Sequence, residues 1–133
     1  MKRSRLRGRV GAAAFIGLAA AIPAAQACGV CVEDKVAATY DHAIVMRAIG
    51  RRQVVVFAAA EGNALGADVA RAMTAAATRV RGIDRASVRS AAAPLALSFA
   101  LDTSVRSPED ALAAIGRAAG VPGLKLSMLK VMR

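Results

Sequence analysis

Aromatic and histidine side chains are scarce in this chain of 133 residues. It has no tryptophan, one tyrosine, three phenylalanines and one histidine. Proteins that bind single-stranded nucleic acid stack the bases on aromatic side chains, and this composition leaves no such platform. One histidine, no paired catalytic carboxylates and no glycine-rich phosphate loop leave no constellation typical of an active site. We therefore expect neither a nucleic-acid-binding protein nor an enzyme.

Residues 1–27 have the pattern of a signal peptide. A cationic start precedes an apolar stretch at residues 10–22, and small residues follow at Ala25 and Ala27. This stretch is shorter than the about 20 residues of a membrane-spanning helix, so we expect cleavage after Ala27 and no stable membrane insertion. The protein is then predicted to be periplasmic or secreted. A retained anchor and lipidation of Cys28 are alternatives, although Ala25 and Gln26 differ from the residues that usually precede a lipidated cysteine.

Much of the positive charge belongs to this leader. The formal net charge is +10, and five basic residues precede residue 10, which leaves +5 for residues 28–133. The remaining arginines are scattered, with no cluster beyond Arg51 and Arg52. This distribution gives no basic patch for nucleic acid. A net charge of +5 favours loose contact with acidic components of the cell envelope. We also expect a protein partner in that envelope.

Hydrophobic periodicity predicts an α+β domain over residues 51–133, preceded by an N-terminal helix. The expected helices are residues 32–49, 66–80 and 108–119, and the expected strands are 53–59, 86–92, 95–101 and 124–132. In the strand at 95–101, large apolar residues alternate with small ones, which predicts a half-buried strand. The order of elements from residue 53 is that of a ferredoxin-like βαββαβ sandwich. Its expected core contains Leu97, Phe99, Ile115 and Leu126.

Three stretches of this domain resemble the heavy-metal-associated domains. Residues 81–88 read Arg-Gly-Ile-Asp-Arg-Ala-Ser-Val, residues 97–102 read Leu-Ser-Phe-Ala-Leu-Asp, and residues 108–120 form an amphipathic stretch that ends in Ala-Gly. The resemblance implies the ferredoxin-like fold. Family members that carry copper or mercury hold Met-x-Cys-x-x-Cys in the loop after the first strand, whereas the loop at residues 59–66 contains no sulfur here. A metal-binding role must therefore use the two N-terminal cysteines.

Those cysteines, Cys28 and Cys31, open the segment of residues 28–50. Thiolates are soft ligands, and this spacing lets both sulfurs reach one ion. Two sulfurs suffice for Cu(I), whereas tetrahedral zinc needs further ligands, so we expect a soft-metal carrier that prefers copper(I) to zinc. His42 and Met46, four residues apart, form a less favoured pair of metal ligands. On one straight helix His42 would lie about 16 Å along the axis from Cys31, too far to share its ion.

Two other functions remain open from the sequence. Cys-Gly-Val-Cys directly before a helix resembles the Cys-Gly-x-Cys of thioredoxin-like proteins, where the helix N-terminus lowers the pKa of the first thiol, and this resemblance implies thiol–disulfide exchange. The same two cysteines can instead form a simple disulfide in an oxidising compartment. In that case the protein is a ferredoxin-like interaction module that binds no metal.

Overall fold

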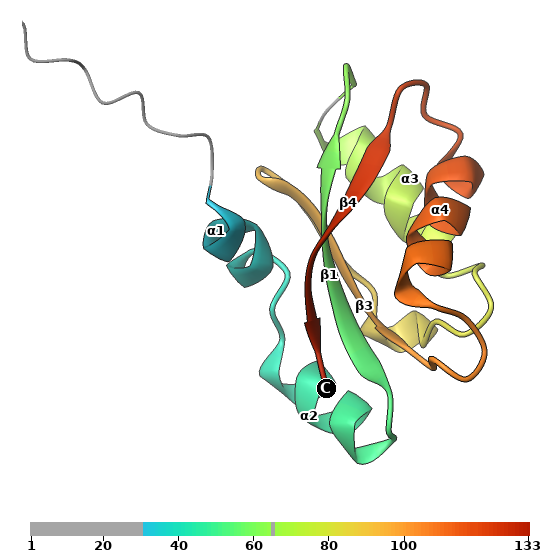
Figure 1. Cartoon of the computed structure of the whole chain (residues 1–133). Coiled ribbons are helices and arrows are strands. Elements are labelled where there is room, and N and C mark those ends of the chain that lie inside the picture. Colours follow the sequence, from blue (N-terminus) through green and yellow to red (C-terminus); the bar gives the residue numbers. More distant parts are fainter. Residues whose placement is uncertain (1–30, 65) are drawn as a thin grey trace, which may run out of the picture.

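The structure, a computed structural model, describes residues 31–64 and 66–133, so the expected signal peptide and Cys28 lie outside the described residues. Within these ranges one antiparallel sheet has the strand order β2-β3-β1-β4. Its strands are β1 (Val54–Glu61), β2 (Arg89–Ala92), β3 (Leu95–Leu101) and β4 (Lys125–Met132). The helices are α1 (Val32–Ala37), α2 (His42–Gly50), α3 (Ala67–Ala77), α4 (Pro108–Ala119) and the short 3₁₀ helix η1 (Arg85–Ser87) (Figure 1). None of these described helices is long and apolar enough to cross a membrane.

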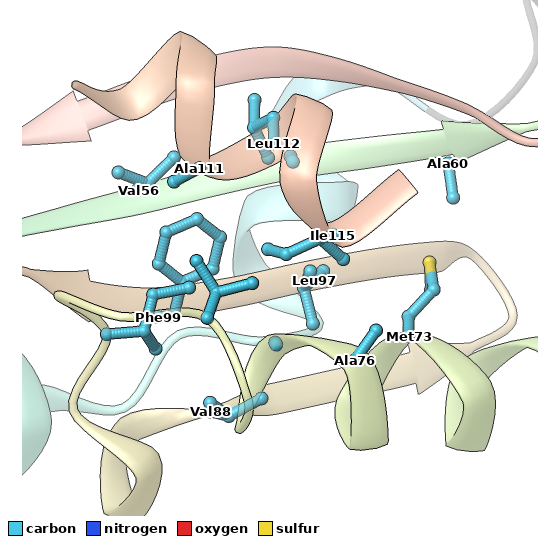
Figure 2. Close-up of a cluster of buried hydrophobic side chains, with 14 of the residues drawn as sticks. Val56, Ala60, Met73, Ala76, Val88, Leu97, Phe99, Ala111, Leu112 and Ile115 are labelled. Atoms are coloured by element: carbon cyan, nitrogen blue, oxygen red, sulfur yellow. The ribbon is translucent and has the colours of Figure 1, made fainter. Parts of the chain in front are cut away.

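The α+β class is confirmed, and the arrangement is compatible with a ferredoxin-like fold. Helices α3 and α4 cover one face of the sheet and enclose the main core. Phe99 and Leu97 of β3 meet Met73 of α3 and Ile115 of α4 there, and all four side chains are completely buried (Figure 2). Helix α4 begins at Pro108, as expected, and the Ser107 hydroxyl caps it by accepting a hydrogen bond of 3.2 Å from the backbone N–H of Asp110.

Helices α1 and α2 lie on the opposite face of the sheet, where a second, smaller core forms. Phe57 of β1 and Ala100 of β3 pack there against Val45 and Ala48 of α2. The alternation along residues 95–101 predicted one solvent-exposed face, and this expectation is wrong, because every residue of β3 is buried. Small side chains on that face leave room for the N-terminal helices.

Residues 31–50 form two helices rather than the single helix expected over residues 32–49, and that expectation is wrong. Residues 38–41 separate α1 from α2. Asp41 then caps α2, since its carboxylate accepts a hydrogen bond from the backbone N–H of Ile44 at 3.1 Å. Thr39 is buried against the sheet. The break lets the chain turn across the sheet, so that both short helices contact it.

Strand β4 forms the edge of the sheet beside β1 and is less buried than the central strands. No residue of β4 is fully buried. Its register with β1 shifts between Phe57 and Ala58, where Leu129 adds an extra residue to β4. Leu126 lies before this bulge and was predicted to be buried, but it is only partly buried against the main core. Apolar residues of β4 contact both cores: Leu126 and Val131 pack against the main core, and Leu129 and Met132 pack against the smaller one.

Candidate functional site

Of the two predicted cysteine ligands, Cys31 lies within the described residues and Cys28 lies outside them. Cys31 is exposed and directly precedes α1. Its carbonyl accepts a hydrogen bond from the backbone N–H of Lys35 at 3.2 Å, while its side chain takes no part in capping the helix. The thiol is therefore accessible to a metal ion or to a thiol of another protein.

Two acidic side chains share the first turn of α1 with this cysteine. Glu33 and Asp34 are both exposed there. The N-terminus of a helix favours negative charge, but α1 has only six residues and already carries these two carboxylates. Their negative charge attracts a cation to the start of α1, close to Cys31.

The loop between α1 and α2 is held on the sheet by two contacts. The Ser98 hydroxyl donates a hydrogen bond to the backbone carbonyl of Thr39 at 2.9 Å in a buried position. The Tyr40 ring stacks on Phe57, with ring centroids 6.4 Å apart and planes 17° apart. These contacts give the start of the described chain a defined position over the sheet.

Two ion pairs add to this attachment from the surface. Asp41 lies 3.5 Å from Arg89 in β2, and Arg51 lies 3.3 Å from Asp84 in the loop before η1. The side chains of both arginines are about half exposed, at 46% and 60%. Exposed pairs of this kind stabilise a protein by about 0 to 1 kcal/mol. The buried contacts of Ser98 and Phe57 therefore contribute more to holding the segment.

The two less favoured ligands, His42 and Met46, lie one turn apart on the exposed side of α2. Met46 is 55% exposed, and His42 is exposed at the first position of the helix. A hydrogen bond of 3.2 Å joins Nδ1 of His42 to the Tyr40 hydroxyl. This contact leaves Nε2 as the nitrogen of His42 that is open to a ligand.

The predicted ligands within the described residues come from two helices, because Cys31 precedes α1 whereas His42 and Met46 lie on α2. One straight helix would separate Cys31 and His42 by about 16 Å along its axis. Because the helix is broken at residues 38–41, this distance does not apply. Even so, no group of three His, Cys, Asp or Glu side chains within residues 31–64 and 66–133 is placed to hold a metal ion. Cys31 lies at the start of α1, and the chain turns toward α2 only after the other end of this helix (Figure 1). An ion at Cys31 must therefore take its second thiolate from Cys28 or from another molecule.

A mostly apolar groove of about 360 Å³ lies between α1 and β4. Its apolar lining includes Val32 and Tyr40, which are 49% and 44% exposed, and Leu129. Glu33 and Lys130 provide its charged groups. The groove begins at the residue after Cys31. A molecule seated in it would lie beside the helix that carries the thiol.

Asp102 has a lowered pKa but belongs to a turn, not to this segment. The hydroxyl of Ser104 donates a hydrogen bond of 2.6 Å to its carboxylate, and the backbone N–H of Ser104 donates a second of 2.9 Å. The hydroxyl contact has the larger effect on the pKa, followed by the N–H contact, because both stabilise the charged carboxylate. The turn directly follows β3, and we assign the shift to its local structure.

No protein-family model, curated protein or solved structure matches this chain. The likeness to heavy-metal-associated domains therefore stays a prediction from the three sequence stretches. Sequence reasoning also missed the groove and its β4 residues, Leu129 and Lys130. A signal for them does exist, because the adjacent apolar residues Met128 and Leu129 interrupt the period of two along that strand.

Proposed function

We propose that this chain is a small exported protein that binds a soft metal ion, most simply Cu(I), through Cys28 and Cys31. The observation that carries the proposal is the exposed thiol of Cys31, three residues from the other cysteine, at the start of a helix that packs on the sheet. Two thiolates complete a linear Cu(I) site, whereas zinc requires four ligands. Copper(I) is therefore the better match to two sulfurs, and the protein works in the periplasm or outside the cell.

The proposal includes a ferredoxin-like fold for residues 51–133, as in the heavy-metal-associated domains. The strand order β2-β3-β1-β4, with α3 and α4 on one face, supports this assignment. The cysteines precede the domain instead of occupying the loop after β1. Because α1 and α2 pack on the second face of the sheet, that face positions the metal-binding segment rather than a partner.

A carrier must release its ion as well as bind it. Cu(I) bound by two thiolates keeps coordination positions open, so a thiolate of a partner can bind before one of the first two leaves. The exposure of Cys31 permits this approach. Glu33 and Asp34 add negative charge that attracts a cation to this end of α1. No catalytic step is assigned to the protein.

The second candidate function is that of an interaction module, and the apolar grooves on both sides of β4 favour it. Thiol–disulfide exchange is a third reading of the same cysteines. One experiment separates these functions: copper and zinc content and a free-thiol count on protein purified without oxygen.

The metal proposal expects about one equivalent of copper, lost in Cys28→Ser and in Cys31→Ser. His42→Ala is the matched control, because it removes the other strong metal-binding side chain of the N-terminal segment, and it should keep the copper. A metal-free protein with a reactive disulfide would instead support thiol exchange. A metal-free protein with an inert disulfide would support the interaction module.

A further inference from the structure

We propose that the free edge of β4 binds an extended segment of another protein, which adds to the sheet as a further strand and alternates apolar with acidic residues. This inference goes beyond the metal proposal and does not depend on it. Strand β4 pairs with β1 on one side, and within the described part of the chain no strand pairs with its other side. An edge of this kind presents unpaired backbone N–H and C=O groups to a partner strand.

On the side of the sheet that carries α4, a groove with a mainly apolar lining borders this edge, and Glu109 and Arg117 of α4 are its charged residues. Its volume is about 500 Å³, and Leu126 and Met128 of β4 face Leu112 of α4 across it. The small residues Ala113 and Gly116 of α4 also line it, and they leave the space open. Met128 is 41% exposed, which is high for a large apolar side chain in a strand. A strand added beside β4 would place every second side chain in this groove.

On the other side of the sheet, the edge is basic. Lys125 pairs in register with Glu61 and Lys130 with Phe57, so both lysines lie on the face opposite the groove. Both are exposed, and β4 itself contains no acidic residue, although Glu61 of β1 is in register with Lys125 and Glu33 of α1 lines a groove together with Lys130. The alternate side chains of an added strand would therefore meet positive charge. A segment that alternates apolar and acidic residues matches both sides of the edge.

The same charges argue against a second copy of this chain as the partner. Pairing two β4 strands would bring four lysines onto one face, with no acidic residue from either strand. Like charges on facing strands destabilise their pairing, and lysine on an edge strand and a bulge within it both discourage self-association. Strand β4 has both lysines and a bulge, the latter at Leu129.

The test titrates two synthetic peptides into the isotope-labelled protein and follows its backbone amide signals by NMR. Each peptide matches the eight residues of β4 in length. One alternates valine with aspartate, and the other carries lysine in place of every aspartate. We expect the aspartate peptide to shift the β4 amides and to bind roughly tenfold more weakly to the Lys125→Glu/Lys130→Glu double variant. That variant should in turn bind the lysine peptide.

The control is the double variant Arg79→Glu/Arg81→Glu, which makes the same change in net charge at exposed positions in the loop between α3 and η1. It should bind the aspartate peptide as the parent protein does. The proposal is overturned if both peptides bind equally, if the control loses as much affinity as the β4 variant, or if the shifted amides lie outside β4 and α4. It is also overturned if sedimentation shows a dimer of the parent protein whose contact maps to the β4 amides, because the edge would then belong to a second copy.

Discussion

The hydroxyl of Ser98 donates a hydrogen bond to the backbone carbonyl of Thr39 at 2.9 Å, across 59 residues of the sequence. Both residues are buried, at 3% and 5% exposure. A buried carbonyl without a partner costs free energy, so this bond stabilises the loop between α1 and α2 on the second face of the sheet. Through that loop it also sets the position of α1 and Cys31.

Replacing Ser98 with alanine should therefore lower the free energy of unfolding by about 1 to 3 kcal/mol, because it leaves the Thr39 carbonyl buried and unpaired. Urea unfolding of the purified variant measures this loss. Ser127→Ala, at an exposed serine in β4, is the matched control and should change little. Equal losses in the two variants would show that the buried hydrogen bond adds no stability.

The main core should depend most on its largest side chain. Phe99 is completely buried between the sheet and the two helices (Figure 2), so Phe99→Ala should cost about 3 to 5 kcal/mol of unfolding free energy. Ile49→Ala is the comparison, because Ile49 is 42% exposed on α2. A loss below about 1 kcal/mol for Phe99→Ala would contradict the position of β3 in the core.

Local signals in the sequence predicted most elements of residues 51–133, because strand alternation and helix caps act over a few residues. We also expected one N-terminal helix packed on this domain, but not that residues 32–50 cover the second face of its sheet. Ala96, Ser98 and Ala100 are small or polar, and their burial depends on a segment about 60 residues earlier. The helix break has the same origin, since Thr39 is buried by contact with β3.

The candidate site was likewise predicted only in part from the sequence. The sequence shows directly that Cys28 and Cys31 are two thiols spaced closely enough to bind one ion, and this led to the proposed ligands. Whether other ligands converge depends on tertiary structure, and within the described residues Cys31 belongs to no group of three His, Cys, Asp or Glu side chains that could hold a metal ion. The grooves beside β4 depend on the bulge at Leu129 and on small residues of α4. No short pattern in the sequence specifies that combination.

A glycine in place of Arg52 should stabilise the protein. Arg52 has a φ of 58°, in the left-handed region, directly after the C-terminal end of α2. Its neighbour Gln53 donates a backbone hydrogen bond of 2.9 Å to the carbonyl of Ala48, as in the helix ending where glycine is preferred. Relief of this conformation should raise the free energy of unfolding by about 0.5 to 1 kcal/mol, after the entropy cost of glycine.

Thermal and urea unfolding measure the effect of Arg52→Gly, and Arg51→Gly is the control. Arg51 has a φ of −96°, which any residue adopts, so glycine there should lower stability. A lower stability for Arg52→Gly as well would mean that the arginine side chain outweighs the backbone conformation.

The turn after β3 should contribute a stability that depends on pH. The pKa of Asp102 is lowered from 3.8 in the folded protein, chiefly by the Ser104 hydroxyl. Its contribution should therefore be complete well above pH 3.8 and disappear as the pH falls through the lower, folded-state pKa. Unfolding of the parent protein and Asp102→Asn should differ at neutral pH and converge in strong acid. A difference that persists unchanged in acid would exclude the carboxylate as its source.

The metal proposal makes a prediction about selectivity. Two thiolates satisfy Cu(I), whereas zinc at Cys28 and Cys31 needs two more ligands, and no group of three His, Cys, Asp or Glu side chains that could hold a metal ion forms within the described residues. Cu(I) should therefore outcompete Zn(II) in a titration against chelators of known affinity. His42→Ala should leave the affinity for Cu(I) nearly unchanged, because the described contact of His42 is with Tyr40. Met46→Ala, which removes the exposed thioether on α2, should also leave it unchanged. Zinc bound more tightly than Cu(I), or Cu(I) binding that survives replacement of both cysteines by serine, would exclude this site.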